Sequence, residues 1–160
     1  MTDEQAVLDC LLDNARYETD DLARMTGLDE DAVAAALDRL EAGPVAGYRP
    51  VVDWDRIDRE HVVAVVECDV ELDRETSYDD VARRLARFDE VATLRLISGE
   101  FDFLLTVEGE SMQEIARFVA DRVAPVPEIT GTVTHYAMET YKEAGEEFDR
   151  DDDDRRSVTP

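Results

Sequence analysis

Apart from its carboxylates, this sequence contains few residues that could do chemistry. The two histidines, His61 and His135, and the two cysteines, Cys10 and Cys68, form neither a CxxC pair nor any other spacing typical of a metal site. No phosphate-binding glycine loop or nucleophile motif is present, and carboxylates are too abundant for spacing to single out an acid/base pair. We therefore expect no metal, no cofactor and no catalytic residue, and interpret both cysteines as buried free thiols in a reducing cytosol.

The chain is strongly acidic. Its 160 residues include 41 Asp and Glu against 17 Lys and Arg, a formal net charge of −24, and Lys142 is the only lysine. One interpretation is an acidic surface that binds cations or basic partners. The other is adaptation to a salt-rich cytoplasm, where surface carboxylates keep a protein hydrated. The even spread of acid and the near-absence of lysine favour the second, and the composition resembles that of haloarchaeal proteins. Net charge bears on solubility and association, not on fold.

Length and hydropathy limit the class of protein. The chain has room for one medium domain or two small ones, and its 44% hydrophobic residues suffice for a core. The N-terminus lacks a basic region followed by an apolar stretch, and the longest apolar run, Val62 to Val66, is too short to span a bilayer. We expect a soluble, cytoplasmic protein with no membrane partner.

The first part of the chain has the periodicity of three helices. A capping box at Thr2 and Gln5 begins the first, Thr19 caps a short second helix over residues 20–25, and Asp29 caps a third that ends at Gly43. The expected inward-facing residues include Leu12 in the first helix and Met25 in the second. Residues 48–54 alternate as a strand does.

The connection between the second and third helices is a tight turn. Thr26, Gly27 and Leu28 form it, with Gly27 as a left-handed stop. Short helices joined in this way are typical of a helix-turn-helix that binds DNA. The alternative is an ordinary small three-helix packing without that function.

From His61 onward the pattern becomes β-α-β-β-α-β. Ser77 with Asp80, and Ser111 with Glu114, are expected to cap the two helices, the second of which should bury Met112. The expected strands are residues 61–72, 91–97, 101–107 and 130–141, with residues 98–100 as the hairpin turn. This order predicts a ferredoxin-like domain, so the whole chain is expected to be an α+β protein.

Two further features concern the surface and the end of the chain. The first strand of the second half is apolar on both faces, so the face not covered by helices predicts contact with a second subunit and hence a homodimer. The tail from Lys142, which contains the acidic run Asp151 to Asp154, is expected to be disordered and solvated. The alternative for the tail is a segment that binds other proteins.

Two stretches carry a resemblance to a known family. The first half contains DLARMTGL at residues 21–28, RLE at 39–41, GYR at 47–49 and VVD at 51–53. The second half contains LRLISGEFDF at residues 94–103, where a strand, a glycine turn and an aromatic-Asp pair follow one another. In this order and spacing the sequence resembles the Lrp/AsnC, or feast/famine, family of transcriptional regulators, in a haloarchaeal version.

The resemblance implies a domain plan and partners. It implies a winged helix-turn-helix that binds double-stranded DNA at residues 1–54, a linker at 55–60, a ferredoxin-like effector-binding and dimerisation domain at 61–141, and a tail at 142–160. Family members form dimers that often assemble into octamers, and an amino acid or related metabolite binds between dimers near the hairpin. The residues expected near the effector are Ile97, Ser98, Gly99, Glu100, Asp102, Thr132 and Thr134.

Gly99 and Asp102 also have purely structural interpretations. Gly99 could serve a turn that needs a positive φ angle, and Asp102 could accept hydrogen bonds from turn amides. These interpretations are weighed equally with ligand binding.

The expected DNA-binding surface departs from the family pattern. Family members usually carry Arg, Lys, Ser or Thr on the exposed face of the third helix, whereas this face includes Ala34 to Ala36 and several Asp. The segment to Trp54 holds 13 acidic residues and 4 arginines, a formal net charge of −9. In molar salt, however, basic phosphate contacts lose most of their value, and repulsion is screened within about 3 Å. The residues expected at the DNA are Arg24, Thr26, Ala34, Ala35, Asp38, Arg39 and Arg49.

The leading hypothesis is thus a DNA-binding transcriptional regulator controlled by a small metabolite. The first alternative is a metabolite-sensing oligomer whose helix-turn-helix no longer contacts DNA. An enzyme is the third: some proteins of similar architecture are sirohaem decarboxylases, which depend on a motif with His and Tyr in the hairpin region. Residues 94–103 contain neither, so we expect no enzymatic activity.

Overall fold

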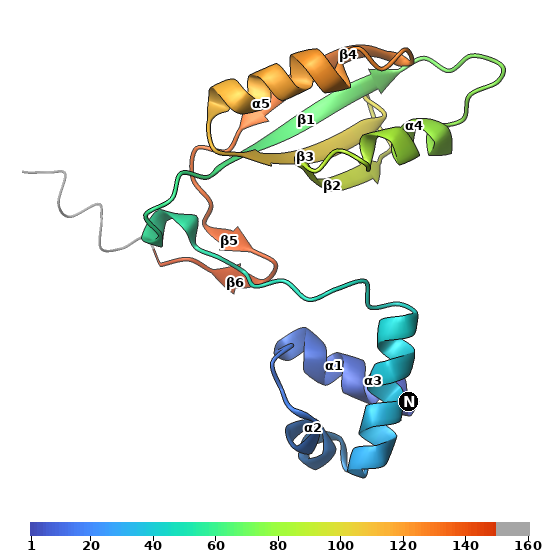
Figure 1. Ribbon diagram of the computed structural model, residues 1–160, viewed down its shortest axis with the longest axis vertical. Coiled ribbons are helices and arrows are strands. Elements are labelled where there is room, and N and C mark those ends of the chain that lie inside the picture. The colour runs from blue at the N-terminus through green and yellow to red at the C-terminus, as the bar shows by residue number, and fades with distance from the viewer. Residues whose placement is uncertain (150–160) are drawn as a thin grey trace, which may run out of the picture. The chain divides into compact units, whose positions relative to one another are not determined.

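The computed structural model describes residues 1–149, and these fall into two compact units. The first unit comprises Met1–Pro50, and the second begins at Val51. Each unit has its own core of buried apolar side chains. Figure 1 labels the helices and strands of both.

The first unit consists of three helices, α1 (Asp3–Asp13), α2 (Thr19–Thr26) and α3 (Glu30–Ala42). The capping box at Thr2 and the Asp29 cap, whose carboxylate accepts from the Ala32 amide at 2.8 Å, are confirmed. The predicted Thr19 cap is wrong. Helix α2 begins one residue earlier, so Glu18 is the N-cap and donates its amide to the Asp21 carboxylate at 3.3 Å.

Six buried side chains form the core of this unit: Val7, Leu11, Leu22, Val33, Ala36 and Leu40. Leu12 and Met25, predicted to face inward, are 76% and 52% exposed. Leu12 directly follows the buried Leu11, so its side chain is rotated about 100° away from the core. Met25 lies between the exposed Arg24 and the half-buried Thr26 in the last turn of α2. The core is small, and helix periodicity alone predicted more buried residues than the structure has.

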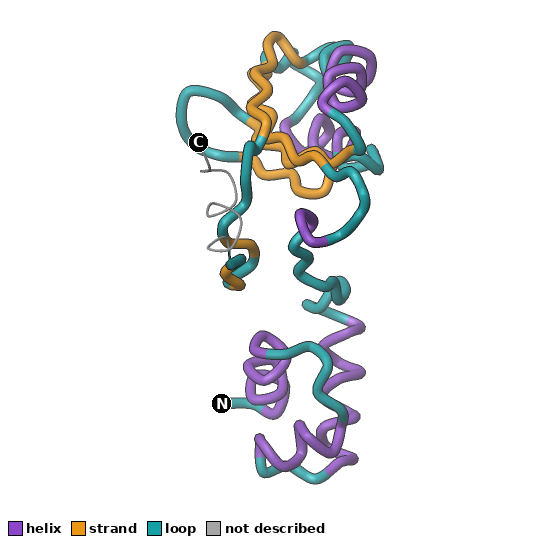
Figure 2. Tube along the Cα trace, turned by 90° about the vertical axis from the view of Figure 1, so that its left-hand side faces the viewer, coloured by secondary structure: helices purple, strands orange, loops and turns teal. Residues whose placement is uncertain are grey.

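No strand forms in residues 48–54, so the strand predicted there is wrong. The segment is loop as far as Asp53, as Figure 2 shows, and Trp54–Arg56 is a 3-10 turn, η1. A strand needs a neighbouring strand for its amides and carbonyls, and no strand in residues 1–149 pairs with this segment. The alternation of apolar and polar residues at 48–54 was therefore not sufficient to predict a strand.

The second unit contains a four-stranded antiparallel sheet. Its strands are β1 (Val62–Val70), β2 (Val91–Leu96), β3 (Phe103–Gly109) and β4 (Ile129–Tyr136), in the spatial order β2-β3-β1-β4. Helices α4 (Tyr78–Leu85) and α5 (Met112–Phe118) lie on the same face of the sheet in Figure 1. A π-helical turn, η2 (Val119–Val123), extends α5. This is the predicted ferredoxin-like arrangement, and the α+β fold class is confirmed.

The helix caps of this unit follow local sequence rules. Ser77 and Asp80 form the predicted capping box of α4, and the Ser111 hydroxyl accepts from the Glu114 amide at 3.1 Å at the start of α5. Met112 is 47% exposed rather than buried. It is the first residue of α5, and the core of the unit is reached only from Ile115 onward.

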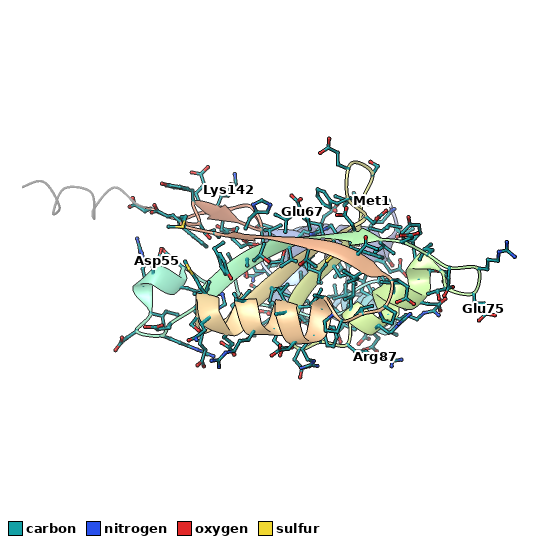
Figure 3. All side chains as sticks on the ribbon, turned by 90° about the horizontal axis from the view of Figure 1, so that it is seen from above. Met1, Asp55, Glu67, Glu75, Arg87 and Lys142 are labelled. Carbon is teal, nitrogen blue, oxygen red and sulfur yellow. The ribbon has the colours of Figure 1, made fainter. Side chains whose placement is uncertain are left out.

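The sheet has one packed face and one open face. Ala64, Val66 and Cys68 of β1 are fully buried beneath the helices, whereas the residues between them are only partly buried. Strand register places the intervening residues of β1 and their partners on the open face, where Glu67 is seen opposite α5 in Figure 3. The open face carries Val63, Val65, Glu67, Thr93, Arg95, Leu104, Thr106, Glu108, Val133 and His135.

The start of the expected disordered tail is folded. Strands β5 (Lys142–Glu143) and β6 (Glu146–Glu147) form a small hairpin whose turn places Ala144 at φ 48° and Gly145 at φ 93°. Two consecutive left-handed residues are what a tight type I′ hairpin requires. The acidic run Asp151 to Asp154 lies outside the described residues.

Candidate DNA-binding and effector sites

The turn between α2 and α3 is held by hydrogen bonds of its own residues. The Thr26 hydroxyl donates to the Leu22 carbonyl at 2.7 Å and accepts from the Leu28 amide at 3.3 Å. Gly27 has φ +76°, a left-handed conformation that a side chain would strain. Thr26, predicted at the DNA, thus has a structural role in holding the turn between the two helices.

The outer face of α3 is small and acidic. Ala34, Asp38 and Arg39 are exposed, and Ala35 is half-buried. Ala36, which the sequence pattern placed on the same face, belongs to the core. The structure thus groups four of the predicted DNA-facing residues on one helix, with one positive charge among them.

Two of the four arginines of the first unit form ion pairs. Arg24 pairs with Asp21 on its own helix, and Arg39 pairs with Glu4 of α1. Arg49 is exposed and has no ion-pair partner among residues 1–149. Exposed pairs of this kind contribute little to stability and are weakened by salt, so Arg24 and Arg39 can be released at small cost.

The hairpin between β2 and β3 presents an exposed loop. The Ile97 amide donates to the Asp102 carbonyl at 2.9 Å and closes it, while Ser98, Gly99 and Glu100 between them are exposed. Gly99 has φ +143°, which agrees with the structural interpretation of this glycine. Within the described part of the chain, the amides of residues 98–101 donate no hydrogen bond.

Asp102 is engaged by the protein itself. Its carboxylate accepts from the Val70 amide at 2.8 Å and from the Tyr78 hydroxyl at 3.0 Å. The structural interpretation of Asp102 is therefore correct in kind, although the donors come from β1 and α4 and not from its own turn. Sequence reasoning missed Tyr78, because a single aromatic at the start of a helix is a common core residue.

Thr132 and Thr134 are not brought to the hairpin loop. Both lie on β4 opposite Cys68 and Val66, on the helix-covered face. Strand β1 lies between β4 and β3, which places Thr132 two strand spacings, about 10 Å, from the hairpin strand. The two threonines therefore lie on a strand that is not a direct neighbour of the hairpin strands β2 and β3.

A charged pair at the edge of the core was also missed. Arg84 of α4 donates to Glu128, just before β4, at 2.6 Å, and the Glu128 side chain is 9% exposed. The second carboxylate oxygen, Glu128 Oε2, is buried without a hydrogen-bond partner in residues 1–149. The hydrogen bond from Arg84 lowers the pKa of the Glu128 carboxyl, which keeps it ionised.

Three other features bear on chemistry. Burial raises the pKa of the Cys68 thiol to about 12, with a smaller contribution from Asp69. No group of three or more His, Cys, Asp or Glu in residues 1–149 is arranged to hold a metal ion. In the same part of the chain, no helix has the length and apolar character needed to cross a membrane.

The described residues thus combine a helix-turn-helix in the first unit with a ferredoxin-like sheet and an exposed hairpin loop in the second. Residues 63–147 match the model of the Lrp/AsnC ligand binding domain. The chain is 34% identical over 157 residues to the uncharacterized HTH-type transcriptional regulator YugG of Bacillus subtilis. The aligned residues cover 97% of this chain and 95% of that protein. It is 25% identical to the leucine-responsive regulatory protein of Haemophilus influenzae, over 86% of this chain and 82% of the relative.

Solved structures have the same fold. LrpA of Mycobacterium tuberculosis superposes with a TM-score of 0.76 at 22% identity, over 91% of this chain and 97% of that one. The regulator NMB0573 of Neisseria meningitidis, in complex with L-Met, gives 0.69 at 20% identity, over 89% and 92% of the two chains. The chain belongs to the Lrp/AsnC family, whose members are transcriptional regulators.

Proposed function

We propose that this chain binds double-stranded DNA through α2 and α3 and responds to an amino acid or a related metabolite bound at the hairpin loop. The observation that carries the proposal is the combination, in one chain, of a helix-turn-helix with a unit that matches the Lrp/AsnC ligand binding domain. No catalytic role and no cofactor are part of it.

DNA recognition would depend on fit more than on charge. The alanines of α3 allow close approach to the major groove and to thymine methyl groups. Arg24, Arg39 and Arg49 would supply the direct hydrogen bonds, with Asp38 facing the same groove. Such an interface suits a salt-adapted cytoplasm, because each phosphate contact contributes a salt slope of about −0.9, and three arginines give at most about −2.7.

Effector binding would use the loop from Ile97 to Glu100. The unengaged amides there suit a carboxylate, and the exposed carboxylate of Glu100 suits an ammonium group. A free amino acid carries both groups. The names of two relatives, one leucine-responsive and one in complex with L-Met, support this class of ligand.

A homodimer would cover the open face of the sheet. The open sheet face carries Val63, Val65, Leu104 and Val133, and a second copy packed on it would bury them. A homodimer formed in this way leaves the hairpin loops at its ends available for contact between dimers, up to an octamer. Thr132 and Thr134 would then meet an effector only through a neighbouring chain.

The test is a gel shift in molar KCl, with the DNA upstream of the chain's own gene and an unrelated fragment of equal length. Sequence-selective binding that changes when a mixture of amino acids is added supports the proposal. Equal binding of both fragments, or none, with or without amino acids, contradicts it.

A second candidate is an amino-acid-sensing oligomer whose helix-turn-helix no longer contacts DNA. The observation in its favour is that Arg24 and Arg39 are both engaged by carboxylates on an Ala- and Asp-rich face. A ligand found by thermal shift, together with no DNA binding in the gel shift, would identify this function.

A further inference from the structure

Asp102 is a centre of hydrogen bonding at the end of the effector loop. Besides the two bonds to its carboxylate, its amide donates to the Cys68 carbonyl at 3.0 Å and its carbonyl accepts from Ile97 at 2.9 Å. Val70 and Cys68 belong to β1, so three of these four bonds tie the loop to the sheet or close it. The fourth, from Tyr78, reaches the loop from a helix 24 residues earlier in the chain.

Tyr78 is itself held firmly. It is the first residue of α4, within the Ser77–Asp80 capping box, and its ring packs edge to face with that of Phe103 at a centroid distance of 6.0 Å. Phe103 is 1% exposed. A half-buried tyrosine fixed at both its backbone and its ring places its hydroxyl at a defined point. The Asp102 carboxylate is thereby bound between a fixed amide and a fixed hydroxyl.

The two carboxylates near the loop, Asp102 and Glu100, have different surroundings. Both oxygens of Asp102 already accept hydrogen bonds from the protein. Glu100, exposed at the tip, has no hydrogen-bond or ion-pair partner within residues 1–149. An incoming ammonium group would therefore be received by Glu100, while Asp102 determines the position of the loop that carries it.

We propose that Tyr78 is a positioning residue for the effector loop: through Asp102 it sets the conformation of residues 97–101 and connects effector binding to α4. The consequence for the effector rests on the proposed function, whereas the connection between Tyr78 and the loop does not. The bond to Asp102 raises the pKa of the Tyr78 hydroxyl, as expected for a donor held against a carboxylate.

The experiment compares Tyr78→Phe with Tyr136→Phe in the full chain. Each removes one tyrosine hydroxyl and one hydrogen bond, since the Tyr136 hydroxyl donates to the Met112 carbonyl at 3.1 Å, far from the loop. Hydrogen exchange of the Val70 and Ile97 amides is measured in the free protein, because both donate to Asp102. Loss of one hydrogen bond to a charged group is expected to speed their exchange about 10-fold in Y78F only.

The second measurement is calorimetric titration with L-leucine and L-methionine. Y78F is expected to bind several-fold more weakly than Y136F at equal melting temperature. Unchanged exchange of Val70 and Ile97 in Y78F, or equal exchange in both variants, overturns the positioning role whatever the titration gives. Faster exchange in Y78F with no amino acid bound by any variant, the wild type included, supports the role of Tyr78 and overturns the effector proposal.

Discussion

Both units of this chain have ion pairs at the surface, but among residues 1–149 only the second has a pair with a buried carboxylate. In the first unit, both ion pairs of the arginines near α3 lie at the surface, with Arg24 and Arg39 side chains 71% and 54% exposed. In the second, Arg84 with Glu128, and Tyr78 with Asp102, join separate elements next to the core. Exposed pairs respond to salt and to a charged partner, whereas partly buried ones are screened much less. The first unit is therefore suited to change partners, and the second to keep its shape.

The largest effect is expected from Leu22→Ala, which tests whether the first unit depends on its own small core. Leu22 is fully buried among six core residues, and loss of its side chain is expected to cost about 2–5 kcal/mol of unfolding free energy. DNA binding should be lost with it. Hydrogen exchange should show the first unit deprotected and the sheet of the second unit unchanged.

Leu12→Ala is the matched control for this prediction. Leu12 lies on α1 and is 76% exposed, so the same truncation is expected to change stability by no more than about 0.5 kcal/mol. If L22A also deprotected β1 and β3, the separation of the chain into two cores would be wrong.

The next effect concerns the shielded pair of the second unit. Arg84→Ala would leave the ionised Glu128 buried without its ion-pair partner, so we expect the melting temperature at neutral pH to fall by several degrees. Arg83→Ala is the control, since Arg83 meets Asp80 at 3.6 Å with side chains 72% and 45% exposed. Its melting temperature should stay near that of the wild type.

The same pair predicts a pH dependence. Because Arg84 lowers the pKa of Glu128 in the folded chain, the pair contributes stability above the ordinary glutamate range, about pH 4.3, and loses it as pH falls through the lower folded value. The difference between R84A and wild type should shrink in that acidic window. A difference that stays constant from pH 7 to pH 3, followed by thermal melts, would contradict this origin.

A smaller effect is expected from Glu4→Gln, which releases Arg39. If Arg39 contacts DNA, its release should raise DNA affinity about 2- to 5-fold in low salt, in keeping with a surface pair worth under about 1 kcal/mol. In molar KCl the pair is already screened and the gain should vanish. Asp9→Asn removes the same charge elsewhere on α1 and serves as the control in fluorescence anisotropy. Equal gains in the two variants would assign the effect to net charge.

Sequence patterns predicted those parts of the fold that local rules determine. The caps at Thr2, Asp29 and Ser77 and the left-handed Gly27 follow from residues within one turn of each other. The ferredoxin-like order followed from the alternation of periods. The strand predicted at residues 48–54 was wrong, because a strand depends on a partner that local alternation does not supply.

In the candidate sites, too, contiguous features were predicted from sequence and contacts between distant residues were not. The hairpin loop from Ile97 to Asp102 was found from its sequence, since a strand, a glycine turn and a second strand are contiguous. The bonds that fix it were not found, because Tyr78 and Asp102 are 24 residues apart and Arg84 and Glu128 are 44 apart. Nothing in either residue's neighbourhood marks its partner, and only the topology of the sheet brings them together.

The smallest expected effect is a difference in the alkylation rates of the two cysteines, one in each unit. Cys68 is fully buried, and burial raises its pKa to about 12, so at pH 8 only about 10⁻⁴ of it is thiolate even when reagent can reach it. Cys10 of α1 is partly exposed. Iodoacetamide should therefore label Cys10 first, and mass spectrometry of the native chain should find Cys68 unmodified until denaturant is added. Equal labelling rates in the native chain would mean that the sheet opens as readily as the small helical unit, and the second unit would then not be the one that keeps its shape.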